Sequence, residues 1–543
     1  MRGTMMDYPL TVQHFLERAH RLFPKKEVAT KTAAGMHRYT YGEFYDRVQR
    51  LANVLSSLGV RKGDRVATFA WNHYRHLELY FAVPCMGAVL HTLNVRLFPD
   101  QLAYVINHAG DQMIFADAAL LPSLEKIRDR IGGVERFVIM SDTRQMPATT
   151  LAPAGDYESL LAEAEPEFSF PMLDELDAAG MCYTSGTTGN PKGVVYTHRA
   201  LFLHSMAEAM ADTAAVGERD TVMPVVPMFH VNAWGLPYTS AMVGAKLVFP
   251  GPHLQPRDLA ELIQNEKVTL AAGVPTLWIG LYGLLERETY DLSSLRCLLV
   301  GGAAVPRTLI EKFEKNFGVT VIHAWGMTEM TPLGTLSRLK SYLMDAPEDT
   351  RFGYRAKQGL EVPGVETKAV DEAGRDVPWD GTTMGELWVR GPWIAGSYYD
   401  DTSLSGAFTR DGWFRTGDVV TIDAEGYVEI TDRTKDLVKS GGEWISSVGL
   451  ESALMGHPKV LEAAVIAIPH ETWQERPLAC VVPKPNSVND ITKEELLEFL
   501  QPMFPKFWLP DDVVFLKEMP KTSVGKFDKK VLRERFRKPG AGA

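Results

Sequence analysis

The sequence is poor in cysteine, and its few cysteines lie far apart. Its 543 residues include only Cys85, Cys182, Cys297 and Cys480. No two of them have the spacing of a zinc site or of a redox motif, which argues against a thiolate metal centre and against a disulfide scaffold. We therefore expect reduced thiols, as in a cytoplasmic protein.

The chain also lacks a long apolar run, a leader-like start and an excess of positive charge. The longest apolar stretch, residues 271–285, is shorter than a membrane span and contains Pro275. Residues 1–16 have no apolar run behind a basic start, so no signal peptide is predicted. The net charge of −11 argues against a nucleic-acid partner. These features predict a cytoplasmic protein without a membrane span; peripheral association with a membrane is left open.

What the chain does have is a loop rich in glycine and hydroxyl groups, residues 183–193, which read YTSGTTGNPKG. Glycines let backbone N–H groups converge on an anion, hydroxyl groups add donors and an Mg²⁺ ligand, and lysine adds positive charge. A solvated linker is the alternative, but a β-strand expected at residues 194–198 and an apolar stretch ahead disfavour it. A Walker loop does not fit, because Gly193 rather than a hydroxyl residue follows Lys192. The loop predicts a polyphosphate site.

Alternating strand and helix patterns predict an α/β fold for most of the chain. Apolar residues at helical spacing over residues 44–58 are followed by a strand at 65–69, and similar alternation returns at 259–274 and 295–321. Such alternation indicates largely parallel sheets. From residue 385 onward, short strands between Gly and Asp turns indicate a small β-rich module.

A charged segment, residues 432–437, is the predicted hinge between two domains. It would separate an N-terminal domain at 1–431, with its β-rich module at about 350–431, from a C-terminal domain at 438–543 that is long enough to fold as α+β. The alternative interpretation is a solvated turn within one domain.

Four short motifs follow at long range. Residues 301–304 (GGAA) leave room for a flat ring against the backbone, and residues 323–329 (HAWGMTE) combine an aromatic ring with a hydroxyl group and a carboxylate. Residues 416–418 (TGD) offer a carboxylate to vicinal hydroxyls, and residues 520–526 (PKTSVGK) present a lysine at a glycine turn. Singly, each is explained equally well as a turn, a helix entry or a charged surface segment.

In this order, the motifs resemble the acyl-adenylate-forming superfamily, which includes acyl-CoA synthetases, peptide-synthetase adenylation domains and beetle luciferases. Residues 226–234 (VPMFHVNAW) and 439–447 (KSGGEWISS) are similar to bacterial medium- and long-chain fatty acyl-CoA synthetases in particular. The resemblance covers nearly the whole chain. It implies two α/β subdomains plus a small β-barrel-like subdomain in a large N-terminal domain, and a small mobile α+β C-terminal domain.

The resemblance implies an acid–thiol ligase. ATP would activate a fatty acid to acyl-AMP with release of pyrophosphate, and coenzyme A would then take the acyl group. The phosphates would be wrapped by Thr184, Ser185, Gly186, Thr187, Thr188, Gly189 and Lys192. The remaining nucleotide-binding residues would be Gly302, Ala303, Ala304, His323, Ala324, Trp325, Gly326, Met327, Thr328, Asp418, Arg433, Lys435, Lys439 and Lys526. The implied catalytic residues are Lys526, Thr184, Glu329 and His230, with Thr184 and Glu329 holding Mg²⁺.

The second step needs the thiol to reach the acyl carbonyl, where Lys526 would be in the way. The resemblance implies that the C-terminal domain rotates about the hinge at Lys435. The rotation would bring in Lys439, Gly441, Gly442, Glu443 and Trp444. The resemblance also suggests a homodimer.

The acyl pocket is expected near His230 and Trp234, lined by residues 271–278. The alternatives are a structural histidine and a core tryptophan. Trp325 stands where the family usually has tyrosine, so the hydrogen bond of a phenol is expected to be lost. A ligase for a short thioether or aryl acid, an enzyme that delivers acyl groups to a carrier protein, and a non-catalytic nucleotide sensor remain competing hypotheses.

Lys526→Ala is expected to abolish acid-dependent exchange of pyrophosphate into ATP and largely to spare thioester formation from supplied acyl-AMP, because the lysine would act only in the first step. Gly441→Leu is the matched contrast, with the opposite pattern expected. Each half-reaction is assayed separately. Equal loss of both half-reactions in Lys526→Ala would contradict a mechanism with two catalytic surfaces.

Overall fold

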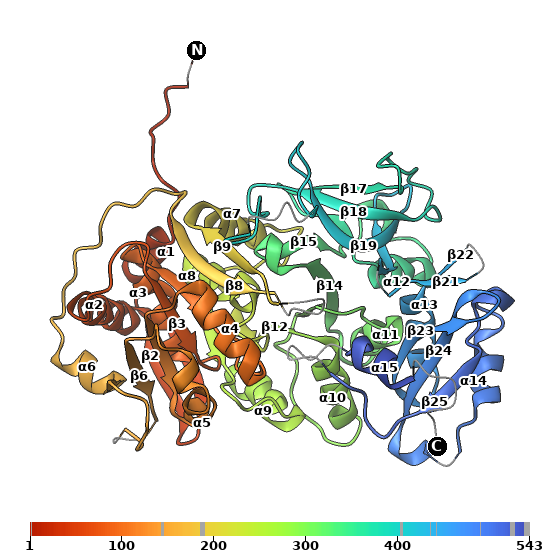
Figure 1. Ribbon diagram of the computed structural model, residues 1–543, viewed down its shortest axis with the longest axis horizontal. Coiled ribbons are helices and arrows are strands. Elements are labelled where there is room, and N and C mark those ends of the chain that lie inside the picture. Colours follow the sequence, from red (N-terminus) through yellow and green to blue (C-terminus); the bar gives the residue numbers. More distant parts are fainter. Residues whose placement is uncertain are drawn as a thin grey trace.

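The protein was analysed as a computed structural model, which describes residues 1, 3–142, 146–184, 190–401, 406–434, 436–440, 443–488, 490–521 and 527–536. A large α/β body is followed by a small antiparallel sheet and by a smaller domain beside it (Figure 1). Some predicted site residues lie outside the described residues: Ser185, Gly186, Thr187, Thr188, Gly189, Lys435, Gly441, Gly442 and Lys526.

The first sheet of the large body is mostly parallel. Its strand order is β7-β6-β5-β3-β4-β8-β9, and only the β8–β9 pair is antiparallel. The strands are β3 (Arg65–Phe69), β4 (Val89–Thr92), β5 (Met113–Asp117), β6 (Arg136–Met140), β7 (Ala154–Asp156), β8 (Ala178–Tyr183) and β9 (Gly193–Thr197). β4 (VLHT) and β5 (MIFAD) are buried along their whole length, so their residues do not alternate between buried and exposed.

The second sheet has the order β16-β15-β14-β13-β12-β10-β11-β1-β2 and is parallel from β14 to β1. Its strands are β1 (Glu27–Thr32), β2 (Gly35–Thr40), β10 (Thr221–Pro224), β11 (Lys246–Phe249), β12 (Leu270–Gly273), β13 (Cys297–Gly301), β14 (Thr320–Gly326), β15 (Leu333–Leu336) and β16 (Leu360–Glu361).

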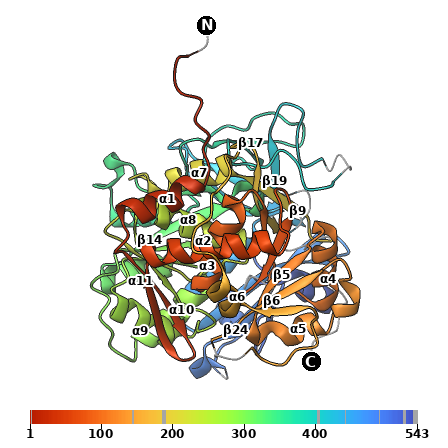
Figure 2. The same ribbon diagram turned by 90° about the vertical axis from the view of Figure 1, so that its left-hand side faces the viewer.

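Helices cover both sheets in layers, and the largest core cluster fills the space between the sheets. The helices of this middle layer are α1 (Gln13–Leu22), α2 (Tyr41–Ser57), α3 (Tyr74–Cys85), α7 (His198–Ala209) and α8 (Leu236–Val243). The outer helices are α4 (Pro99–Ala109) and α5 (Leu121–Glu125) on the first sheet, and α9 (Pro256–Glu266), α10 (Pro275–Leu285) and α11 (Arg307–Phe317) on the second. Figure 2 shows α1, α2 and α3 crossing between the sheets.

Two smaller helices and a small sheet complete the N-terminal part. The helices are α6 (Tyr157–Glu163) and α12 (Glu348–Ala356). The sheet is fully antiparallel, with strands β17 (Glu366–Val370), β18 (Gly385–Arg390), β19 (Phe414–Ile422) and β20 (Val428–Arg433). Because β20 continues to Arg433, the first two residues of the predicted hinge belong to this sheet.

The C-terminal domain is a mixed sheet with helices on it. Its strands are β21 (Val438–Ser440), β22 (Glu443–Ile445), β23 (Val460–His470), β24 (Gln474–Pro483) and β25 (Asp512–Phe515). Its helices are α13 (Ser447–Gly456), α14 (Lys493–Leu500) and α15 (Lys529–Phe536). Together these elements confirm the predicted fold class, with the small β-rich subdomain formed as an antiparallel sheet.

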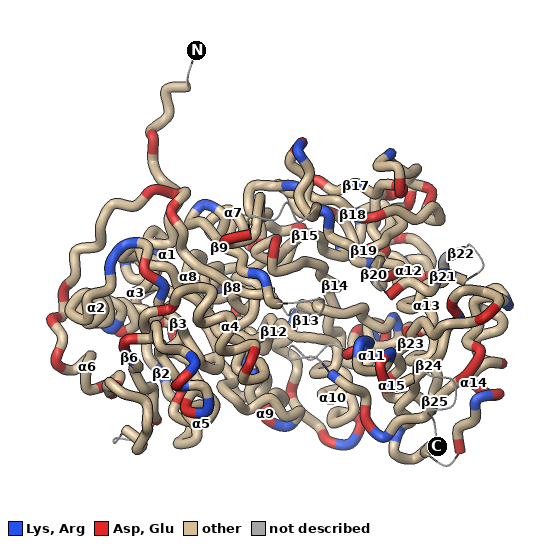
Figure 3. Tube along the Cα trace, in the orientation of Figure 1, with Lys and Arg blue, Asp and Glu red and all other residues tan. Residues whose placement is uncertain are grey.

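Positively and negatively charged residues are interspersed along the chain of both domains (Figure 3). Of the helices in the described part of the chain, none combines the length and the apolar character needed to cross a bilayer.

A buried ionic network joins three helices under the first sheet. The Glu78 side chain on α3 is fully buried and accepts hydrogen bonds from Arg47 Nε on α2 at 2.7 Å and from the Tyr157 hydroxyl on α6 at 2.5 Å. Burial raises the pKa of Glu78 despite the guanidinium beside it. The positive charge of Arg47 therefore offsets the cost of burying this carboxylate.

Arg47→Met should destabilise the N-terminal domain by about 3–5 kcal/mol at neutral pH, because it leaves a buried carboxyl without its partner. In the variant the folded-state pKa of Glu78 rises further above its unfolded value. The destabilisation caused by the substitution therefore becomes larger as the pH rises and smaller as the pH falls. Thermal unfolding at about pH 5.5 and about pH 8 measures this difference. Arg50→Met on the same helix removes a guanidinium that bonds only the Ala164 carbonyl oxygen, and its effect should not depend on pH. A pH-independent loss in Arg47→Met would contradict the assignment.

Candidate active site

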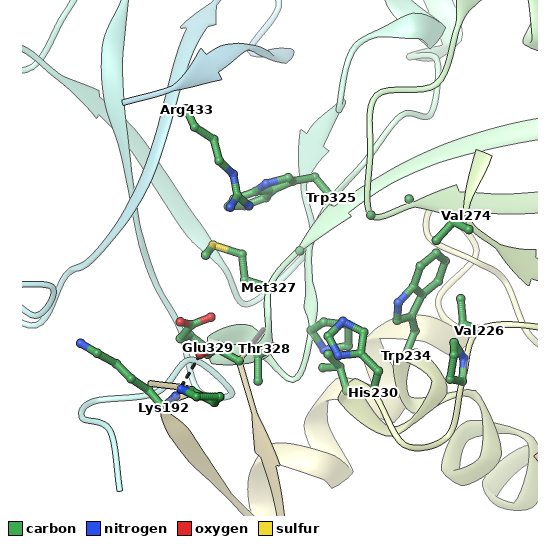
Figure 4. A pocket seen from close by; sticks show the side chains of 18 of the residues that line it. Lys192, Val226, His230, Trp234, Val274, Trp325, Met327, Thr328, Glu329 and Arg433 are labelled. Carbon is green, nitrogen blue, oxygen red and sulfur yellow. Dashed lines mark hydrogen bonds between the residues drawn. The ribbon is translucent and has the colours of Figure 1, made fainter. Parts of the chain in front are cut away.

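A cavity of about 740 Å³ opens at the carboxyl ends of β10, β12, β13 and β14 and is closed on its other side by the C-terminal domain. Ligands of open α/β sheets bind at this edge. Figure 4 shows Lys192, Thr328 and Glu329 towards one end of the pocket and Val226, His230 and Trp234 towards the other. One cavity therefore has a polar end and an apolar end.

The polar end contains the base of the glycine-rich loop. Thr184 follows β8 and Lys192 precedes β9, so the loop connects two antiparallel strands. The Thr184 N–H donates to the Lys192 carbonyl oxygen at 2.9 Å, and the Lys192 N–H donates to the Thr184 hydroxyl at 3.1 Å. The Lys192 ammonium lies 4.5 Å from the centre of the Tyr398 ring and 3.8 Å from Asp401 Oδ2. The sequence prediction of a strand directly after the loop agrees with β9.

Glu329 brings a buried carboxylate to the same end. It is 5% exposed, and the Tyr398 hydroxyl donates to its Oε1 at 2.6 Å. Burial raises the pKa of Glu329, so the carboxylate would gain from a nearby cation. Thr184 lines the same cavity. Carboxylate and hydroxyl oxygens fit Mg²⁺, which takes few protein ligands and completes its shell with water and phosphate oxygens. Within the described residues, no three His, Cys, Asp or Glu side chains gather as a transition-metal site requires.

The far wall is built on the end of β14 and ties together three parts of the chain. The Trp325 indole N–H donates to Asp418 Oδ2 on β19 at 2.9 Å, and Arg433 Nε on β20 lies 3.1 Å from Asp418 Oδ1. Asp418 is 2% exposed, so both of its oxygens are held in the interior. The indole N–H thus makes a hydrogen bond of its own, and the expected loss of the phenol's hydrogen bond stays a prediction.

Five described residues that were predicted to bind the nucleotide are absent from the cavity lining: Ala303, Ala304, His323, Asp418 and Lys439. The His323 side chain is buried against α12, with Nδ1 2.9 Å from the Ala356 carbonyl oxygen, and burial lowers its pKa to about 4. Ala303 and Ala304 follow the turn at Gly302, whose φ is +83°, and they do not border the cavity. The proposed contacts of these residues with a nucleotide stay predictions. Gly302 and residues 324–328 do line the cavity.

The apolar end is formed by a backbone in an unusual conformation. Val231, Asn232, Ala233 and Trp234 have φ values of +45°, +53°, +49° and +58°, a left-handed turn that costs about 1–2 kcal/mol per residue for L-amino acids. His230 lies just before this turn. The turn lays the Trp234 indole against the sheet: an atom in the position of a Cβ on Gly301 would lie 3.4 Å from Trp234 Cη2.

Asn72 holds the segment that leads into this turn. Its side-chain amide donates to the carbonyl oxygens of Pro224 and Val226 at 2.8 Å each, and its Oδ1 accepts from the Met228 N–H at 2.7 Å. The sequence analysis missed Asn72 and Tyr398. The available signal for Asn72 was its position just after the carboxyl end of a parallel strand.

The prediction that residues 271–278 line the acyl pocket is wrong for most of them. In this stretch only Val274 borders the cavity. β12 runs inside the sheet, and Trp278 is fully buried beneath it, 2.7 Å from where a Cβ on Gly273 would lie. The run is apolar because it is core.

The C-terminal side of the cavity is formed by the chain directly after Lys526. Phe527, Asp528, Lys529, Lys530 and Arg533 border it. The described residues of β21 and β22, which include Lys439 and the backbone of Glu443 and Trp444, do not. The structure thus turns residues 527–533 towards the cavity and leaves the described part of β21 and β22 away from it.

Comparison with known proteins places this geometry in a family. The model of the AMP-binding enzyme family matches residues 16–399, and that of its C-terminal domain matches residues 449–526. A long-chain-fatty-acid–CoA ligase of Thermus thermophilus is 52% identical over 100% of this chain and 98% of its own length. A 3-methylmercaptopropionyl-CoA ligase of Ruegeria pomeroyi is 44% identical over 99% of both chains.

The fold recurs in solved structures that contain an adenylate. The crystal structure of an anthranilate–CoA ligase in complex with anthranoyl-AMP superposes with a TM-score of 0.86, at 25% identity over 97% of this chain and 98% of that one. With family models covering both its large N-terminal part and its small domain, the chain belongs to the AMP-binding enzymes.

Proposed function

We propose that the protein is an AMP-forming acid–thiol ligase that activates a medium- or long-chain fatty acid with ATP and transfers the acyl group to coenzyme A. One observation carries the proposal. The described base of the glycine-rich loop and Glu329 share a single cavity with the apolar wall around Trp234, so a polyphosphate and an alkyl chain can meet there.

In the first step a carboxylate attacks the α-phosphate of ATP, and two anions must be brought together in line. Thr184, Lys192 and the loop between them would hold the β- and γ-phosphates. Trp325 and Gly302 would flank the adenine, and the pair of Asp418 and Arg433 would hold the ribose. Mg²⁺, held by Glu329 and Thr184, would supply charge neutralisation for the leaving pyrophosphate. Tyr398 orients Glu329 for this role.

The orientation of the C-terminal domain supports assigning this arrangement to the first step. Phe527 directly follows Lys526 and borders the cavity, so Lys526 would reach the α-phosphate and the carboxylate. Transfer to coenzyme A would then need Lys439 and residues 441–444 to replace it by rotation about residues 432–437. The Mg²⁺ requirement, the homodimer and the cytoplasmic location stay predictions.

A short thioether acid is the second candidate substrate. It is favoured by the full-length similarity to the Ruegeria enzyme, whose name specifies such an acid. A screen of acids separates the two candidates.

We expect pyrophosphate release to depend on acid chain length, with kcat/KM rising about three- to fourfold for each methylene from butyrate to at least octanoate, since a buried CH₂ contributes about 0.8 kcal/mol. Omitting coenzyme A should limit release to a burst, and adding it should give turnover with acyl-CoA as product. A maximum at 3-methylmercaptopropionate would favour the second candidate. Turnover without acyl-CoA would contradict the proposed ligase.

Trp325→Phe should raise KM for ATP about tenfold, because it keeps an aromatic face but removes the donor to a buried carboxylate. Steady-state kinetics at saturating acid measures the change. Trp379→Phe is the matched control, since Trp379 is 52% exposed and does not border the cavity. Equal KM values in the two variants would contradict a role of Trp325 in nucleotide binding.

A further inference from the structure

Two neighbouring buried polar side chains, of which Glu208 borders the cavity and His204 does not, have no part in the proposed chemistry. His204 and Glu208 lie one turn apart on α7 and are 1% and 2% exposed. Glu208 borders the same cavity as His230 and Trp234. A carboxyl group is costly in such surroundings unless it has partners, so its presence there calls for a physical explanation.

The hydrogen bonds of His204 define its tautomer. The Leu333 backbone N–H donates to Nε2 at 3.2 Å, so Nε2 carries the lone pair. Burial lowers the pKa of His204 to about 3, so the ring is neutral at pH 7 and its proton is on Nδ1. Within the part of the chain that the structure describes, this Nδ1–H finds no acceptor at hydrogen-bond distance; the nearest carboxyl oxygen, Glu208 Oε2, is 4.0 Å away.

Glu208 is also largely neutral. Burial raises its pKa to about 8, although the Thr239 hydroxyl donates to Oε2 at 2.5 Å. The two side chains therefore form a pair of uncharged polar groups separated by more than a hydrogen bond. An oxygen atom about 2.8 Å from each would close the gap.

The Gly235 backbone packs directly against this pair. Its φ is +81°, and a Cβ there would lie 2.6 Å from His204 Cε1 and 3.2 Å from Glu208 Oε2. A larger residue would therefore push both side chains out of place. The fold accommodates the pair at the cost of a left-handed residue at the start of α8.

We propose that His204 and Glu208 form a polar end of the acyl pocket, which binds an uncharged hydroxyl group at the far end of the acyl chain. The proposal rests on the proposed function and names its substrate class: ω-hydroxy acids whose length spans the pocket. The hydroxyl oxygen accepts from His204 Nδ1–H and donates to Glu208 Oε2. An alkyl chain of the same length displaces water and leaves both groups unpaired, and an ω-carboxylate brings charge to a site of neutral groups.

The test compares kcat/KM for acyl-CoA formation by the full-length enzyme, using straight-chain acids from butyrate to palmitate and the ω-hydroxy acid of each length. The ratio of hydroxy acid to alkyl acid should rise to about tenfold over a narrow range of lengths and fall on both sides. Dicarboxylic acids should show no such maximum. A ratio that is flat or falls steadily with length means that the pair holds only water, and it overturns the proposal.

Variants locate the effect. Glu208→Met should abolish the maximum and raise kcat/KM for the alkyl acid of that length, whereas Glu208→Gln, which keeps hydrogen-bonding groups, should retain it. Glu163→Met carries the same change to an exposed position on α6 and should behave as wild type. If Glu208→Met does not fold, the wild-type enzyme and Glu208→Gln still test the proposal. A wild-type profile without a maximum in the ratio contradicts it.

The two proposals fail differently. Absence of acid-dependent pyrophosphate release with every acid would contradict the ligase itself. Release with a flat ratio would contradict only the polar end of the pocket.

Discussion

The buried carboxylate of Asp418 is the constraint on which the site depends. An interior carboxylate needs partners for both oxygens, and here they come from the indole of Trp325 and the guanidinium of Arg433. The bonds fix the small antiparallel sheet against the second large sheet. Because Arg433 is the last residue of β20, the same bonds also fix where the chain enters the C-terminal domain. One side chain thereby sets the relation between Trp325 and Arg433, which lie beside each other at the pocket (Figure 4).

The apolar wall depends on a different balance. Four consecutive L-residues in a left-handed turn are unfavourable by themselves, and the surrounding contacts have to compensate for that cost. Asn72 makes three hydrogen bonds to the segment before the turn, and the Tyr80 hydroxyl donates to the Met228 carbonyl oxygen. The strain is therefore held by the segment after β3 and by α3, although the turn lies between β10 and α8. Trp234 can be placed accurately only because both sheets are in position.

Local patterns were sufficient to predict several helices and strands, whereas the phosphate-binding role of the glycine-rich loop stays a prediction. The helix expected at 44–58 is α2 at Tyr41–Ser57, and the strand expected at 65–69 is β3. Helical periodicity and glycine chemistry are properties of neighbouring residues, so one sequence reveals them. The direction of a side chain depends on tertiary packing, which neighbouring residues do not reveal. His323 lies within a predicted motif, yet α12 draws its ring away from the cavity.

Contacts between distant segments of the chain could not be predicted, because they depend on the fold and not on neighbouring residues. Tyr398 orients Glu329 across 69 positions of sequence, and Asn72 holds Val226 across 154. Residues 271–278 were expected in the pocket because apolar composition alone does not separate a core strand from a ligand wall. The distinction depends on what lies on the other side of the sheet, which here is α10 and its Trp278.

The hinge is tied to the helix next to Lys526. Arg533 on α15 lies 2.5 Å from Asp436, and the Ser447 N–H of α13 donates to Asp432 at 2.7 Å. Asp436 follows the predicted pivot, so its contact with α15 stays on one side of the hinge, whereas Asp432 precedes the pivot and its bond to α13 crosses the hinge. The proposed rotation would therefore have to break the Ser447–Asp432 bond, while the Arg533–Asp436 contact could persist.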